Sequence, residues 1–120
     1  MKKHILVVDD EATIRELLAQ YLDHSGYLVT AVGSAAEAER VIAANPPQLV
    51  ISDLQLEDSD GLVMIERLKS ALPDTPVILL TGVLFDPQVV KATLSGKVSS
   101  YLQKATPLNR ILDEIRRLIG

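Results

Sequence analysis

The chain has no cysteine and no tryptophan, and it contains only three tyrosines and one phenylalanine. The lack of cysteine excludes disulfide bonds and thiolate zinc sites, and it is typical of proteins that work in a reducing compartment. The scarcity of aromatic rings leaves too few stacking platforms for a binder of single-stranded nucleic acid. These absences favour a cytoplasmic protein.

Long apolar runs and a surplus of positive charge are also missing. No run reaches the roughly 18 apolar residues of a membrane span, and four apolar residues after the charged start are too few for a signal peptide. The net charge is −4, from 12 basic and 16 acidic residues. We therefore expect no membrane insertion and no direct nucleic-acid binding by this domain, so that any DNA binding would belong to another domain.

The composition that remains is that of a folded globular protein. The hydrophobic content is 48% and the mean hydropathy is +0.21, which excludes disorder. A length of 120 residues suits one domain with one core of ordinary size. We expect a single compact domain over residues 1–120, and any output domain would follow residue 120.

Strand-like and helix-like segments alternate along the chain. The runs that predict strands are residues 5–8, 27–32, 49–52, 77–80 and 99–103. Between the first two runs, apolar residues recur at helical spacing and Gly26 supplies a left-handed stop; these residues are Ile14, Leu17, Leu18, Tyr21 and Leu22. The next segment opens with Ser34 and Glu37, which predict a capping box.

Turn and cap residues mark the remaining helices. Asp60–Gly61 precedes the third, Asp86–Pro87 opens a short fourth around residues 89–94, and Thr106–Pro107 opens the last. Five strand–helix units are too few for an eight-fold barrel. They predict a doubly wound α/β fold with a five-stranded parallel sheet in the order 2-1-3-4-5.

Polar residues follow the predicted strands at their carboxyl ends. Asp9 and Asp10 follow the first strand, Asp53 follows the third and Thr81 follows the fourth. In the predicted order these strand ends are neighbours, with Lys104 beside them at the end of the fifth. Mutual repulsion among three carboxylates calls for a cation, and an all-oxygen donor set favours Mg²⁺ or Mn²⁺ over zinc.

This pocket predicts phosphoryl transfer with a carboxylate nucleophile. Attack by Asp53 on phosphorus would form an acyl phosphate. Lys104 would pair with one phosphoryl oxygen and the Thr81 hydroxyl would hydrogen-bond to another. A hard cation would neutralise charge in the transition state.

The same residues resemble the motifs of a two-component response-regulator receiver domain, which has a flavodoxin-like (βα)5 fold. The matching segments span the chain and are Val7-Val8-Asp9-Asp10-Glu11, Ser52-Asp53-Leu54, Asp60-Gly61, Leu80-Thr81-Gly82 and Tyr101-Leu102-Gln103-Lys104. The resemblance implies that Asp53 accepts phosphate from a sensor histidine kinase or phosphotransfer protein. It implies no enzymatic activity beyond this self-phosphotransfer and self-dephosphorylation.

The resemblance also assigns the metal and the switch. It implies that Asp10, Asp53 and the backbone carbonyl of Gln55 hold Mg²⁺ directly, with Asp9 acting through water. It implies that Thr81 and Tyr101 respond to the phosphoryl group and alter the surface of the fourth helix, fifth strand and fifth helix.

Two residues depart from the family pattern, because Glu57 and Ala105 stand where the family usually has proline. A non-proline cis bond costs about 2.5–4 kcal/mol, so we expect Lys104–Ala105 to be trans. The departures leave open a receiver-like module that binds partners without phosphorylation. A metal-dependent phosphohydrolase would need a second acid at position 55, where Gln55 stands.

The two histidines do not suggest a metal site. His4 and His24 have no acidic or cysteine partners at metal-ligand spacing. We therefore expect both rings to be solvated. The oligomeric state stays open.

Overall fold

The computed structural model describes residues 2–53, 61–82 and 98–120. The strands are β1 (His4–Val8), β2 (Leu28–Val32), β3 (Leu49–Ser52), β4 (Val77–Thr81) and β5 (Ser100–Gln103). The described helices are α1 (Ala12–His24), α2 (Ala35–Ala44), α3 (Gly61–Ala71) and α5 (Leu108–Ile119). The strands form one parallel sheet in the order β2-β1-β3-β4-β5, so the predicted doubly wound, flavodoxin-like topology is confirmed.

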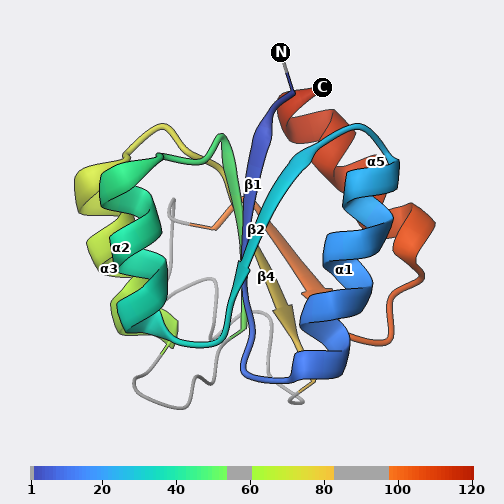
Figure 1. Ribbon diagram of the computed structural model, residues 1–120, viewed down its shortest axis with the longest axis horizontal. Helices are drawn as coiled ribbons and strands as arrows, with labels where there is room; N and C mark the ends of the chain where they lie inside the picture. Colours follow the sequence, from blue (N-terminus) through green and yellow to red (C-terminus); the bar gives the residue numbers. More distant parts are fainter. Residues whose placement is uncertain (1, 54–60, 83–97) are drawn as a thin grey trace.

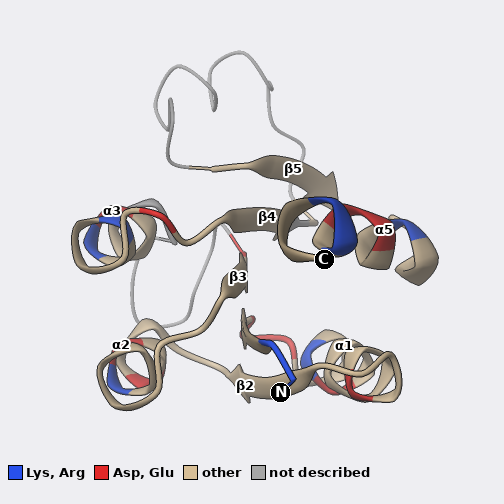
Figure 2. Cartoon of the chain, turned by 90° about the horizontal axis from the view of Figure 1, so that it is seen from above, with Lys and Arg blue, Asp and Glu red and all other residues tan. Residues whose placement is uncertain are grey.

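The sheet lies between two layers of helices. Helices α2 and α3 cover one face and α1 and α5 cover the other, as Figure 1 shows and as the view from above in Figure 2 repeats. Strand β1 pairs with both β2 and β3, and all five of its residues are buried. This double coverage explains the uninterrupted apolar run of β1, because both of its faces pack against helices.

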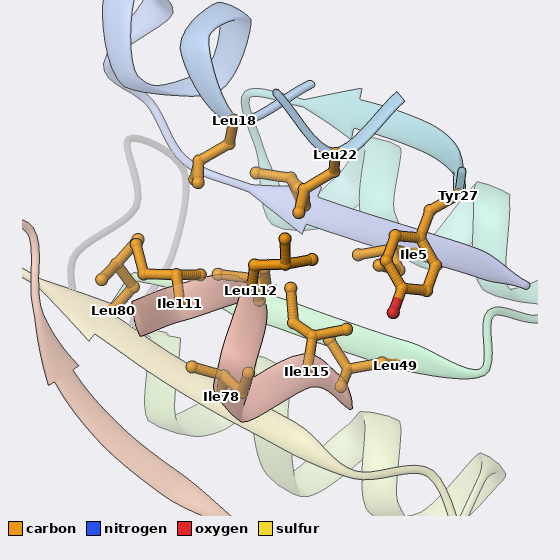
Figure 3. Close-up of a cluster of buried hydrophobic side chains, with 12 residues drawn as sticks. Ile5, Leu18, Leu22, Tyr27, Leu49, Ile78, Leu80, Ile111, Leu112 and Ile115 are labelled. Atoms are coloured by element: carbon orange, nitrogen blue, oxygen red, sulfur yellow. The ribbon is translucent and has the colours of Figure 1, made fainter. Parts of the chain in front are cut away.

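Alternate residues of each central strand enter two separate cores. Leu6 and Val8 point to the core beneath α2 and α3, whereas Ile5 and Val7 point to the core beneath α1 and α5. Figure 3 shows the second core, in which side chains of α1 and α5 meet over the strands; they include Leu18, Leu22, Ile111, Leu112 and Ile115.

Several local predictions are confirmed at single residues. The Ser34 hydroxyl accepts a hydrogen bond from the Glu37 N–H at 3.2 Å and caps α2. Gly26 ends α1 with a φ of 99°, in the left-handed region. Leu17 differs from its predicted apolar stripe, since its side chain is 47% exposed. It precedes the buried Leu18 by one residue and therefore points about 100° away around the helix.

The expectation that His4 is solvated is wrong. Its side chain is buried at the start of β1, and its Nε2 lies 2.8 Å from the Thr30 hydroxyl oxygen on β2. The parallel register explains this contact, because His4 pairs with Leu28 and Thr30 is the next residue on the same face of β2. His24, the last residue of α1, is exposed as expected.

Some predictions fall outside the described residues. They concern the fourth helix around residues 89–94, its opening at Asp86–Pro87, and the positions of Gln55 and Glu57. Among the described segments, no helix is long and apolar enough to cross a membrane.

Candidate functional site

The register of the sheet brings two of the predicted acids together. Val8, the last residue of β1, pairs with Ser52, the last residue of β3, so Asp9 and Asp53 leave neighbouring strands at the same level. The Asp53 N–H donates to the Val8 carbonyl at 3.1 Å, which extends the ladder to the site itself. Backbone pairing therefore determines where both carboxylates begin.

The acids form one cluster of mixed exposure. Asp9 and Asp53 are only 2% and 5% exposed, whereas Asp10 and Glu11 are exposed. One carboxylate oxygen from each of these four residues lies within 4.8 Å of the others. Such closely spaced oxygens suit a hard divalent cation, and burial of two of them limits how far water can screen their repulsion.

Lys104 reaches this cluster from the end of β5. Its Nζ lies 2.8 Å from Asp53 Oδ2, 3.1 Å from Asp9 Oδ1 and 2.6 Å from Glu11 Oε1. Burial by itself lowers the pKa of the ammonium, but hydrogen bonds to the three carboxylates outweigh it and raise the pKa of Lys104 above its usual value. The side chain is therefore a charged ammonium at neutral pH.

Asp9 behaves differently from the lysine that it contacts. Burial raises the pKa of its carboxyl above the usual 3.8, although the Glu11 N–H and Lys104 both act to lower it. The Glu11 N–H donates to Asp9 Oδ1 at 2.9 Å. The carboxyl thus ionises at a cost in desolvation that one ammonium and one backbone donor only partly offset.

The switch residues predicted from the sequence lie on the neighbouring strands. Thr81 is the last residue of β4 and pairs with Gln103, directly before Lys104. Tyr101 pairs with Leu79 and packs, half-buried, against the core beneath α2 and α3. Burial raises the pKa of the Tyr101 hydroxyl. No cis peptide bond occurs in the described part of the chain, so Lys104–Ala105 is trans as predicted.

Two residues join the site that the sequence reasoning did not single out as functional. Glu11 contributes a carboxylate to the cluster, and Arg15 Nη1 donates to the Asp9 backbone carbonyl at 2.8 Å. A signal was available for Arg15, because it lies one helical turn after Glu11 on α1 and so shares its side of the helix. Its backbone target could not be identified from the spacing alone.

Known proteins are similar to this chain in sequence and in fold. The "Transcriptional regulatory protein GlrR" of Escherichia coli is 39% identical over 101 residues, which cover 84% of this chain and 22% of that protein. The "DNA-binding transcriptional regulator NtrC" of Rhizobium meliloti is 35% identical over 116 residues, which cover 97% of this chain and 24% of that protein. The chain thus spans about a quarter of the length of these two relatives.

A solved structure gives the same result at the level of the fold. The response regulator receiver domain protein (CheY-like) of Methanospirillum hungatei superposes with a TM-score of 0.90 at 26% identity, covering 98% of this chain and 93% of that one. The family model described as "Response regulator receiver domain" matches residues 5–116. Because this match covers nearly the whole chain, the chain belongs to the receiver domains of two-component response regulators.

Proposed function

We propose that this receiver domain is a phosphorylation switch in which Asp53 accepts a phosphoryl group from a sensor histidine kinase or a phosphotransfer protein. The observation that carries the proposal is the 2.8 Å contact between Lys104 Nζ and Asp53 Oδ2 within a cluster of acids. This contact puts a charged donor at the carboxylate that would react. Asp53 is also the acid that the strand register places beside Asp9.

In the proposed reaction, a carboxylate oxygen of Asp53 forms a bond to phosphorus. The bond between phosphorus and the donor breaks, and the donor leaves with its electron pair. Lys104 stays within reach of the new phosphoryl oxygens and offsets their charge. Its pKa, raised by the surrounding carboxylates, keeps it protonated throughout.

The acid cluster fits Mg²⁺ or Mn²⁺. We propose that Asp10, Asp53 and the backbone carbonyl of Gln55 bind the ion directly and that Asp9 acts through water. When bound, the ion would neutralise charge on the phosphoryl group during transfer. The fit rests on four carboxylates with oxygens within 4.8 Å of one another, with the Lys104 ammonium beside them.

The proposed output is a change in the surface near β5. Thr81 would bind a phosphoryl oxygen and Tyr101 would turn inward behind it. The half-buried position of Tyr101, three residues before Lys104, supports a link between the site and that surface.

A receiver domain is not a conventional enzyme, and we propose that its chemistry is limited to transfer to Asp53 and hydrolysis of the product. We also propose a cytoplasmic location, and an output domain beyond residue 120 would fit the greater length of the two relatives.

The experiment is intact-mass measurement after incubation with acetyl phosphate and Mg²⁺. We expect one phosphoryl adduct on the native chain with Mg²⁺, none on the native chain incubated with EDTA instead, and none on Asp53→Asn. Asp113→Asn is the matched control, because it removes an exposed carboxyl from α5 and should leave the adduct intact. An adduct on Asp53→Asn would reassign the acceptor, and no adduct on any folded variant would favour a phosphorylation-independent binding module.

A further inference from the structure

Arg15 connects helix α1 to the backbone of the acidic turn, which consists of residues 9–11 after β1. Its Nη1 donates a hydrogen bond to the Asp9 carbonyl at 2.8 Å. That carbonyl belongs to the planar peptide unit that joins Asp9 to Asp10. Holding this one oxygen therefore orients the unit from which both acidic side chains project.

The Arg15 guanidinium occupies space that a side chain at residue 33 would crowd. A Cβ at Gly33 would lie 2.9 Å from Arg15 Nη1 and 3.6 Å from Arg15 Cζ. Positive φ angles among the described glycines occur at Gly26 and Gly120, so Gly33 does not need glycine for its backbone conformation. Its role is to leave space for the guanidinium between the turn after β2 and the turn after β1.

The surroundings place this contact next to the exposed acid. Asp10, Arg15 and Gly33 line one open pocket, together with Ser34 at the start of α2. The other groups of the acidic turn are also held. The Asp9 N–H donates to the Val32 carbonyl at 3.1 Å, and the Glu11 N–H donates to Asp9 Oδ1 at 2.9 Å.

We propose that Arg15 is a positioning residue for the cation site, and that it acts through the Asp9 carbonyl in the space left by Gly33. The proposal rests on the function proposed above, since it concerns the carboxylates that would hold the metal. Arg15 itself contacts backbone in this cluster and is not assigned to the phosphoryl group. Its effect is to keep Asp9 and Asp10 turned toward Asp53.

The sign of the effect separates positioning from electrostatics. A guanidinium near a cation site repels the ion, so removing its charge alone would strengthen metal binding. Loss of a hydrogen bond that orients the ligands would weaken metal binding, typically by about 10–100-fold. The two roles therefore predict opposite changes.

The experiment is a Mn²⁺ titration, with free Mn²⁺ followed by its electron paramagnetic resonance signal and no phosphoryl donor present. The variants are Arg15→Gln, Gly33→Ala and the double variant. Gly33→Ala keeps the charge and displaces only the end of a flexible side chain. Arg40→Gln, which removes an exposed arginine of α2, is the charge-matched control.

We expect each single variant to weaken Mn²⁺ binding by about tenfold while thermal unfolding shows a folded protein. The double variant should bind Mn²⁺ no more weakly than the weaker-binding single variant, because both substitutions remove the same contact between Arg15 and the Asp9 carbonyl. Arg40→Gln should bind like the native chain.

Unchanged or stronger binding in Arg15→Gln, or unchanged binding in Gly33→Ala, would overturn the positioning role. Additive losses in the double variant would also overturn it, because they would mean two separate contributions. If the native chain itself neither binds Mn²⁺ nor forms the adduct, the function proposed above fails first. The two failures are thereby distinguished.

Discussion

The two ends of strand β1 bury polar groups in different ways. At the amino end, the His4 side chain is buried and its Nε2 lies 2.8 Å from the Thr30 hydroxyl oxygen. At the carboxyl end, Asp9 is buried to a similar degree and lies among other carboxylates and the Lys104 ammonium. The four residues Ile5–Val8 therefore separate a hydroxyl–imidazole contact from a charged cluster.

The difference shows at which end of β1 unfavourable electrostatic repulsion remains in the folded protein. His4 Nδ1 has no hydrogen-bond partner in the described residues, which costs one unmade bond. The carboxyl end holds several acids around one ammonium, and their repulsion is relieved only in part. Acid clusters with partly compensated charge are typical of sites where a ligand supplies the remaining positive charge, whereas the His4 contact with Thr30 is explained without a ligand.

The largest effect should come from removing the Lys104 ammonium from the charged end. Lys104→Met removes the ammonium that contacts the buried carboxylates of Asp9 and Asp53, and we expect the free energy of unfolding at pH 7 in EDTA to fall by about 3 kcal/mol. Mg²⁺ should restore part of the loss, because it supplies positive charge to the same oxygens. Urea unfolding with and without Mg²⁺ measures both effects.

The control for this variant is Lys2→Met, which removes an exposed lysine and should change stability by less than about 0.5 kcal/mol. A Lys104→Met chain as stable as the native one would mean that the acid cluster relaxes or protonates without cost.

A smaller effect is expected at the amino end. His4→Ala removes a buried ring and the partner of Thr30, and we expect a loss of about 2 kcal/mol in the free energy of unfolding. Because the ring lies at the opposite end of β1 from the acids, the yield of phosphoryl adduct should not change. His24→Ala, at an exposed position, is the control in the same urea series. Loss of the adduct in folded His4→Ala would show that the two ends are coupled.

The smallest effect should be a change in the pH dependence of stability. Burial raises the pKa of Asp9 above 3.8, so the folded protein holds this proton more tightly than the unfolded chain does. The resulting stabilisation is fully present below the unfolded pKa and is lost as pH rises through the folded pKa.

Asp9→Asn removes this titration. In metal-free protein, we therefore expect the stability of Asp9→Asn relative to the native chain to increase as pH rises from about 3 toward neutrality. Urea unfolding across that range in EDTA measures the difference. A relative stability that decreases with pH would mean that Lys104 and the Glu11 N–H dominate over burial.

Much of the fold was predictable from local patterns. The strand at Leu49–Ser52 has the predicted bounds, and Ser34 caps α2 as its spacing with Glu37 indicates. These features depend on neighbouring residues, so a short segment contains the information. The error at His4 has the opposite cause. Its burial depends on Thr30, which parallel pairing brings beside it from a distant segment.

The sequence by itself determined that acids follow β1 and β3 and that strands alternate with helices, because apolar periodicity and right-handed crossovers leave few topologies. From that order, the meeting of Asp9 and Asp53 followed. Only the tertiary structure decided that Lys104 reaches three carboxylates at once and that Arg15 passes Gly33 to the Asp9 carbonyl. These contacts depend on side-chain directions and on the space between turns far apart in the chain, which no local pattern specifies.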